Sequence, residues 1–113
     1  MNFKIVPTPF FERELKKLTK KHPSLKKNIS TLAQELLQNP RLGTSLGAEC
    51  YKIRMAISSK GKGKSGGARV ITYLQIINEI IFLVAVYDKS EMENIALADI
   101  QERVKRIHAH ARK

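Results

Sequence analysis

Apolar residues in the first third of the chain recur at the spacing of amphipathic helices. A short apolar run over Phe3–Val6 predicts an opening strand, because Pro7 cannot continue it. A Thr-Pro pair at residues 8 and 9 is typical of a helix start, and the apolar stripe that follows predicts a helix as far as the His-Pro pair at 22 and 23. A second stripe predicts another helix from about Pro23 to Gln38. Since almost no chain separates the two helices, we expect an antiparallel hairpin.

The middle of the chain changes from helical spacing to the two-residue period of strands. Residues 43–49 contain two glycines and are predicted to form a loop. From Cys50 to Ser58, apolar and polar side chains alternate, which predicts a strand with one buried and one solvated face. Two more strands are predicted over residues 68–77 and 79–87, joined at Asn78, which tolerates a positive φ. Apolar spacing after Ser90 predicts a C-terminal amphipathic helix.

The predicted order, β-α-α-β-β-β-α, separates the helices from an antiparallel sheet and indicates the α+β fold class. The chain has 113 residues, enough for one hydrophobic core, so we expect a single domain over residues 1–113. Its longest apolar run, Ile80–Tyr87, is far shorter than the roughly 20 residues that a membrane helix needs. No signal peptide is recognisable either, so we expect a cytoplasmic protein that makes no membrane contact.

The excess of basic residues indicates what kind of partner the protein binds. Lys and Arg total 21 against 10 Asp and Glu, a formal net charge of +11, which favours a polyanion such as nucleic acid. A hydrophobic content of 42% argues against a disordered basic tail. Cys50 is the sole cysteine, which excludes intramolecular disulfides and Cys-rich zinc sites and fits a reducing cytoplasm. His108 and His110 are two residues apart on a predicted helix and make a poor metal pair, so we expect neither metal nor cofactor.

The segment Lys60–Arg69 contains four of the six glycines, and no acidic residue lies between Glu49 and Glu79. It imitates parts of the dinucleotide-binding and P-loop motifs, but those motifs open a helix, whereas here a strand is predicted to follow. Two interpretations stay open. The segment is either a solvated hairpin connection or a loop that lies along a nucleic-acid backbone and neutralises its phosphates. In the second case the candidate RNA-binding residues are the loop lysines, Lys60, Lys62 and Lys64.

Four basic residues come from neighbouring elements of the predicted meander: Lys52, Arg54, Arg69 and Lys89. On one concave face they would suit RNA cleavage, in which the ribose 2′-OH attacks phosphorus and the added negative charge needs stabilisation. The alternative is a set of separate surface salt bridges. The lysine-rich surface of the first two helices is likewise open to two readings, as a solvated face or as a contact with nucleic acid.

Three segments together resemble the RelE/HigB toxins of type II toxin–antitoxin systems. They are Tyr51–Arg54, Gly66–Tyr73 and Val84–Glu91, in the element order β-α-α-β-β-β-α. The stretch Lys64–Arg69 is similar to the HigB-like branch of the RelE/ParE superfamily. The resemblance implies the microbial-ribonuclease-like toxin fold. It also implies ribosome-dependent endoribonuclease activity on translated mRNA, as an mRNA interferase, and inhibition by a cognate antitoxin.

The resemblance also implies roles for the four basic residues. Lys52 would deprotonate or orient the ribose 2′-OH, while Arg54, Arg69 and Lys89 would stabilise the pentacoordinate phosphate and the leaving oxygen. Several members of the family have a tyrosine after the last strand, where this chain has Ile95. The proton donor is therefore unassigned. Tyr87, a further candidate for RNA binding, or Tyr73 would substitute for that tyrosine, unless both simply pack within their strands.

Two other functions remain open. One is that of a ParE-like inhibitor of DNA gyrase that cleaves no RNA, and the other is that of a basic nucleic-acid or ribosome-binding module without toxicity. A cluster of Lys52, Arg54, Arg69 and Lys89 around one face favours the ribonuclease. In each toxin reading a +11 chain is complemented by an acidic, partly disordered antitoxin.

Overall fold

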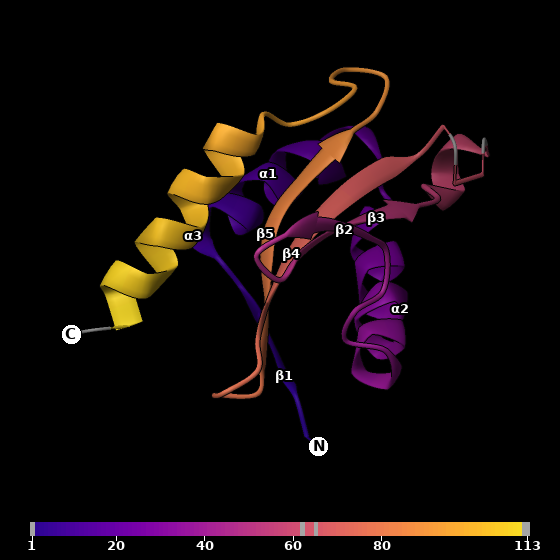
Figure 1. Ribbon diagram of the computed structural model, residues 1–113. Helices are drawn as coiled ribbons and strands as arrows, with labels where there is room; N and C mark the ends of the chain where they lie inside the picture. The colour runs from indigo at the N-terminus through magenta and orange to yellow at the C-terminus, as the bar shows by residue number, and fades with distance from the viewer. Residues whose placement is uncertain (1, 62, 65, 112–113) are drawn as a thin grey trace.

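The computed structural model describes residues 2–61, 63–64 and 66–111, which form one five-stranded sheet with helices on both faces (Figure 1). The elements along the chain are β1 (Lys4–Pro7), α1 (Pro9–Lys21), α2 (Leu25–Gln38), β2 (Thr44–Gly47), β3 (Cys50–Met55), the 3-10 turn η1 (Ser58–Lys60), β4 (Ala68–Gln75), β5 (Ile80–Asp88) and α3 (Leu97–Ala111). The predicted α+β class is confirmed, with one strand more than the predicted order contains.

The sheet is mixed, which corrects the prediction of a purely antiparallel one. The strand order is β1-β5-β4-β3-β2, and β1 pairs with β5 in parallel while all other neighbours are antiparallel. Thr8 extends the parallel pairing, because its amide and its hydroxyl both donate to the Leu83 carbonyl, at 3.1 and 2.8 Å. The same hydroxyl accepts from the Phe11 amide at 3.4 Å, which confirms the predicted cap of α1.

The additional strand, β2, lies in the segment predicted to be a loop. It has a single large apolar residue, Leu46, so it carries no alternating pattern. It pairs with β3 through a turn at Ala48 and Glu49, whose φ angles of 51° and 62° are those of a tight hairpin turn. Neither residue is the Gly or Asn that usually marks such a turn, and the prediction of a loop is wrong for that reason.

The β4–β5 connection is also wider than predicted. The two strands end at Gln75 and begin at Ile80, and the positive φ falls on Glu79, at 54°, and not on Asn78. The apolar Ile77 continues the hydrophobic pattern of β4 but lies in the turn, where it is 93% exposed. Hydrophobic patterning alone therefore placed the end of the strand too late.

Two hydrophobic clusters fill the two sides of the sheet. α1 and α2 cover one face with side chains that include Phe11, Leu25 and Leu36, against β3, β4 and β5. α3 covers part of the opposite face, where Ile100 and Ile107 join a cluster from β4 and β5. Figure 1 shows α3 and α2 on opposite sides of the sheet. No helix in the described part of the chain is long and apolar enough to cross a membrane.

Candidate active site

Three of the predicted site residues are direct neighbours across the sheet. Arg54 on β3 pairs with Arg69 on β4, and Arg69 pairs with Tyr87 on β5. Lys52 lies two residues before Arg54 and therefore points to the same side of β3. The alternation predicted for this strand is confirmed, because Ile53 between them is 4% exposed and belongs to the cluster on the other face.

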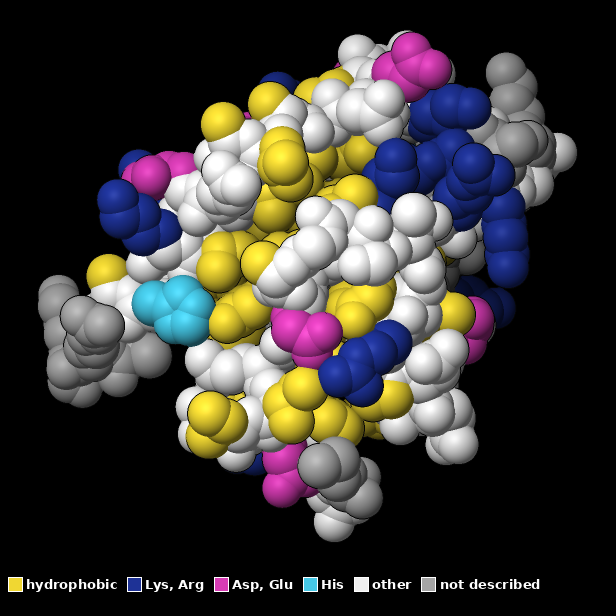
Figure 2. All heavy atoms as spheres, in the orientation of Figure 1, with side chains coloured by type: hydrophobic (Ala, Val, Ile, Leu, Met, Phe, Trp, Pro, Cys, Tyr) yellow, Lys and Arg dark blue, Asp and Glu magenta, His cyan; other side chains and the backbone are white. Residues whose placement is uncertain are grey.

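Lys89 reaches the same end of the sheet through the backbone. It directly follows β5, and its amide donates to the Gly67 carbonyl at 3.1 Å, just before β4 begins. The structure thus brings together all four predicted catalytic positions, Lys52, Arg54, Arg69 and Lys89, which we call the basic row. Figure 2 shows Lys and Arg side chains gathered over this end of the sheet.

Gly67 makes this close arrangement possible. A Cβ atom at residue 67 would lie against the Met55 carbonyl oxygen, far inside contact distance, and 3.0 Å from both the Ala56 Cα and the Ile57 amide nitrogen. Only glycine allows the start of β4 to approach the end of β3 this closely. The close approach holds the basic row together across the two strands.

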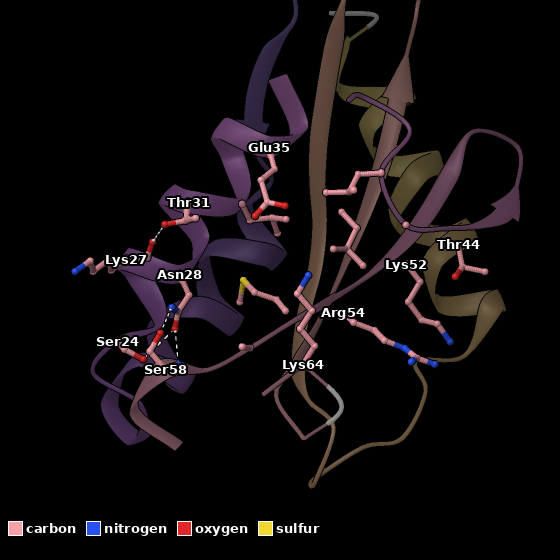
Figure 3. A pocket seen from close by; sticks show the side chains of 16 residues that line it. Ser24, Lys27, Asn28, Thr31, Glu35, Thr44, Lys52, Arg54, Ser58 and Lys64 are labelled. Atoms are coloured by element: carbon pink, nitrogen blue, oxygen red, sulfur yellow. Dashed lines mark hydrogen bonds between the residues drawn. The ribbon is translucent and has the colours of Figure 1, made fainter. Parts of the chain in front are cut away.

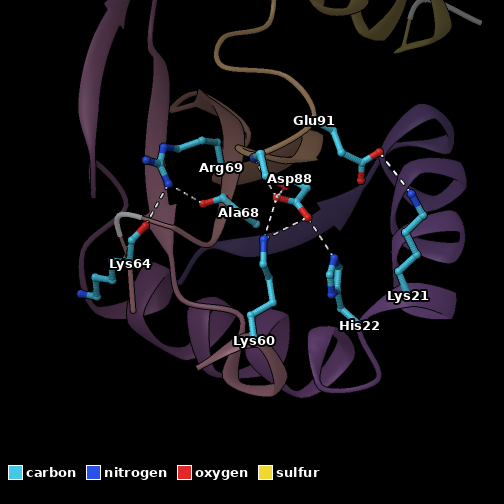
Figure 4. Close-up of polar contacts among 9 residues, drawn as sticks. Lys21, His22, Lys60, Lys64, Ala68, Arg69, Asp88 and Glu91 are labelled. Atoms are coloured by element: carbon cyan, nitrogen blue, oxygen red, sulfur yellow. Dashed lines mark hydrogen bonds and ion pairs between the residues drawn. The ribbon is translucent and has the colours of Figure 1, made fainter. Parts of the chain in front are cut away.

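Arg69 is the buried member of the basic row, with 4% of its surface exposed. Its Nη1 donates to the carbonyl oxygens of Lys64 and Ala68, at 3.0 and 3.1 Å (Figure 4). The guanidinium therefore holds the Lys64 backbone against β4, at the glycine-rich segment, by which we mean residues 60–67. Replacing Arg69 would remove these contacts as well as a positive charge.

Lys52 and Arg54 are the members that border an open groove. The groove has a volume of about 740 Å³ and runs between α2 and β3. Figure 3 shows the side chains of Lys52 and Arg54 beside each other on one side of β3, with Lys64 extending into the groove from the glycine-rich segment. Arg54 is exposed and Lys52 is half-buried, and the Lys52 ammonium donates to Asn94 Oδ1 at 3.0 Å.

The loop lysines differ in their environments. Lys60 is tied into the protein, since its ammonium lies 3.1 Å from the Asp88 carboxylate and its side chain is 16% exposed. Lys64 is exposed and borders the groove. Lys62 lies outside the described residues. RNA binding by these lysines remains a prediction, and Lys64 has the geometry that suits it best.

Tyr87 lies inside the protein. It is 4% exposed and belongs to the cluster that contains Ile95. Its hydroxyl is buried and, among the described residues, makes no hydrogen bond of good geometry. Burial raises the pKa of Tyr87, opposed in part by the Ile95 backbone and by the charge of Arg69. The ring is packed within this cluster and is not presented to an RNA base.

A buried carboxylate beneath the basic row was missed by the sequence reasoning. Asp88 is 3% exposed and accepts hydrogen bonds from Lys60 Nζ, from the amide and hydroxyl of Ser90, and at 2.9 Å contacts His22 Nε2 (Figure 4). Burial raises the pKa of Asp88, but the bonds from Ser90, Lys60 and His22 outweigh it and lower that pKa to about 2. The carboxylate is therefore charged at neutral pH.

A local signal for this carboxylate exists in the sequence. An aspartate followed two residues later by serine is typical of a turn in which the side chain accepts from the backbone, as Asp88 does from the Ser90 amide at 2.9 Å. The contacts with Lys60 and His22 span 28 and 66 residues of sequence, and no local pattern predicts them. In the described part of the chain, no group of three His, Cys, Asp or Glu side chains is arranged to bind a metal ion.

Comparison with known proteins agrees with this fold. The family model described as the RelE toxin of the RelE/RelB toxin–antitoxin system matches residues 3–112. A mutant of the E. coli RelE toxin in the free state superposes with a TM-score of 0.61 and 23% identity, over 95% of this chain and 99% of that one. The isolated E. coli RelE toxin gives a TM-score of 0.55 and 22% identity, with the same coverage of both chains.

The fold is therefore the one found in solved RelE toxin structures, with the basic row at one end of its sheet. Because the family model matches nearly the whole chain, the protein belongs to the RelE toxin family of toxin–antitoxin systems. This confirms the family inferred from the sequence. Membership of the HigB-like branch stays a prediction.

Proposed function

We propose that this toxin is an endoribonuclease that cleaves mRNA on the ribosome in the cytoplasm and so inhibits translation. The observation that carries the proposal is the basic row, in which four cationic residues from two strands, β3 and β4, and from the segment after β5 lie at one end of the sheet. A phosphodiester gains negative charge when a nucleophile adds to phosphorus. Fixed cations in a preorganised site stabilise that charge more than mobile ions in water do.

The chemistry that suits such a site uses the RNA's own nucleophile. The ribose 2′ oxygen attacks the adjacent phosphorus, the bond to the 5′ oxygen of the next nucleotide breaks, and the products are a 2′,3′-cyclic phosphate and a 5′-hydroxyl. A proton leaves the 2′-OH and another reaches the departing 5′ oxygen. This reaction requires no metal-bound water, because the nucleophile belongs to the substrate, and we propose a mechanism without metal or cofactor.

The environments of the individual residues suggest how they share this work. Lys52, which Asn94 holds in place, would orient the 2′-OH, and the exposed Arg54 would contact the non-bridging phosphate oxygens. Arg69 and Lys89 would add positive charge beneath the phosphate. Side by side, these groups recognise a phosphate without reading a base, so sequence preference would come from elsewhere.

The groove between α2 and β3 begins at the stretch of β3 that carries Lys52 and Arg54, on the α2 side of the strand, and offers space for the flanking nucleotides. Cationic side chains of Lys27 and Lys64 line it together with the polar side chains of Asn28 and Ser58, against the single acid Glu35. A basic groove with amide and hydroxyl donors suits an RNA backbone, because each cation neutralises one phosphate and releases counterions.

The proposed dependence on the ribosome rests on the kinds of side chain that the site contains. Its members supply positive charge, while Tyr87 is buried and His22 is engaged by Asp88. In-line attack requires the 2′ oxygen, phosphorus and leaving oxygen to be aligned, and alignment alone contributes several orders of magnitude to such reactions. We propose that the ribosome holds the mRNA in that alignment while the basic row stabilises the transition state. The cognate antitoxin would prevent this by binding the toxin.

The experiment uses purified toxin and a 5′-labelled mRNA, either free or bound to ribosomes with a codon in the A site. Wild-type protein is expected to cut only the ribosome-bound message. Arg54→Ala should lower the single-turnover rate by about 100-fold or more, the usual effect of removing one stabilising donor. Arg106→Ala removes an exposed arginine from α3, away from the basic row, and is the matched control. An uncut message together with inhibited gyrase supercoiling would overturn the proposal.

A further inference from the structure

Asp88, at the end of β5, connects its own turn to three other segments of the chain. Its carboxylate contacts His22 at the end of α1 at 2.9 Å, Lys60 at the end of η1 at 3.1 and 3.3 Å, and Ser90 after β5 at 2.8 and 2.9 Å. Through its backbone it also pairs with Ala68, the first residue of β4. The buried side chain of Asp88 therefore links α1, the Lys60 end of the glycine-rich segment and Ser90, while its backbone pairs with the residue that follows the other end of the segment.

The glycine-rich segment is closed at its base by these contacts. Its first part is held by Lys60, and its last part by the hydrogen bond from the Lys89 amide to the Gly67 carbonyl at 3.1 Å. Within the segment the Lys64 carbonyl accepts from Arg69. The Asp88 side chain therefore holds one end of the segment whose other contacts are made by Arg69 and Lys89, two members of the basic row.

A second set of contacts fixes η1 against α2 without Asp88. Asn28 Nδ2 donates to Ser58 Oγ at 2.7 Å, and the Ser59 amide donates to Ser24 Oγ at 2.9 Å. These bonds place η1 itself, whereas the ion pair with Asp88 connects η1 to the end of β5. Loss of the Asp88 charge would therefore release the connection to the basic row and leave η1 attached to α2.

We propose that Asp88 is a positioning residue for RNA cleavage, which holds the glycine-rich segment and Lys89 in the arrangement that aligns the basic row. This rests on the proposed function for its catalytic consequence, but not for its structural one. Four of residues 60–67 are glycines, and ordering a glycine costs more backbone entropy than ordering any other residue, so contacts from outside the segment are needed to offset that cost.

Stability alone does not account for such an arrangement. Buried ion pairs generally add little net stability, because the cost of desolvating both charges offsets their attraction. Their directional bonds nevertheless select one arrangement of the groups they join. Here the ion pair joins the segment that carries Lys64 to the end of β5, directly before Lys89. The arrangement that it selects is therefore that of the candidate site.

The test compares the isosteric Asp88→Asn with Glu91→Gln, which makes the same chemical change at an exposed carboxylate paired with Lys21. The first readout is the rate of tryptic cleavage after Lys64 in the folded, full-length protein. We expect Asp88→Asn to speed this cleavage by about tenfold, since local opening exposes the segment. Glu91→Gln should be cleaved at the wild-type rate. Wild-type cleavage of Asp88→Asn would overturn the proposal.

The second readout is cleavage of ribosome-bound mRNA. Asp88→Asn should lower kcat by about tenfold or more and leave KM for programmed ribosomes within about twofold, since charge on the surface is hardly altered. Wild-type kcat, or a loss confined to KM, would contradict a positioning role. If wild-type toxin itself cuts no mRNA, the proposed function fails, while the tryptic readout still decides whether Asp88 orders the segment.

A double variant separates positioning from folding. Asp88→Asn leaves the Lys60 ammonium without its partner, which destabilises the protein by itself. Asp88→Asn with Lys60→Met removes both charges and is expected to recover the wild-type melting temperature. Under the proposal, fast tryptic cleavage after Lys64 and the low kcat persist in this double variant. Recovery of both along with the melting temperature would assign Asp88 to stability alone and overturn the proposal.

Discussion

Replacing Gly67 by alanine tests whether close contact between β3 and β4 builds the basic row. The added methyl would overlap the Met55 carbonyl oxygen and lie 3.0 Å from the Ala56 Cα, where carbon atoms normally approach to about 3.5 Å or more. Both obstacles are backbone atoms, which no rotamer change can move. The two strands must therefore separate locally, beginning at the Met55–Ala68 pair and its neighbour Arg54–Arg69.

The size of the effect follows from this geometry. Overpacking a well-filled interior typically costs about 1–3 kcal/mol, and immovable obstacles place Gly67→Ala near 3 kcal/mol. For a domain of this size each kcal/mol lowers the melting temperature by about 4–8 °C, so we expect a decrease of roughly 15 °C. RNA cleavage measured well below the melting temperature should fall too, since Arg54 and Arg69 no longer keep their register.

Thermal unfolding followed by circular dichroism measures the change, with Gly63→Ala as the control. Gly63 has a φ of 68° and nothing within 4 Å of an added Cβ, so its replacement costs only the left-handed backbone strain, about 1 kcal/mol. Gly67→Ala should therefore melt well below Gly63→Ala. Equal melting temperatures for the two variants would refute the argument from close approach.

Three further predictions concern charged groups. Because the pKa of Asp88 is lowered to about 2 in the folded protein, its charge should add about 2 kcal/mol to the free energy of unfolding above pH 4, and this contribution is lost as the pH falls through 2. Urea unfolding should show the loss in wild type and not in Asp88→Asn. Arg103 donates to both Glu14 oxygens at 2.8 and 2.9 Å, so Arg103→Ala should lower the free energy of unfolding by about 2 kcal/mol, and an unchanged urea midpoint would contradict this. Lys64→Met should reduce the slope of log K against log salt for single-stranded RNA by about 0.7, whereas an identical slope would place Lys64 outside the interface.

The fold was predictable wherever a periodic apolar pattern met a clear boundary signal. Thr8 and Pro9 located the start of α1, and the alternation after Cys50 placed Lys52 and Arg54 on one face of β3. β2 was not predicted because its sequence has no alternation of apolar and polar residues and its turn has Ala48 and Glu49 in place of glycine or asparagine. Parallel pairing of β1 with β5 depends on contacts about 75 residues apart, which local patterns do not encode.

The candidate site was predictable as a set of positions but not as a set of environments. Strand alternation and the resemblance to RelE/HigB toxins located four basic positions, and strand pairing and the Lys89–Gly67 hydrogen bond place these positions at one end of the sheet. Nothing in the sequence distinguished the buried Arg69 from the exposed Arg54, or revealed that Lys60 pairs with Asp88. These differences arise from how the glycine-rich segment folds back on β4, a long-range property that residue types alone do not determine.

The central claim is that the basic row cuts translated mRNA, and mapping of mRNA 5′ ends in cells tests it most directly. Wild-type toxin and the Arg54→Ala variant are expressed briefly from a tightly controlled promoter, and 5′ ends are located by primer extension within minutes. New ends at codon positions within translated messages, absent when the start codon is removed and absent with Arg54→Ala, are the predicted result. Growth arrest with intact messages, or equal cutting by the variant, would contradict it.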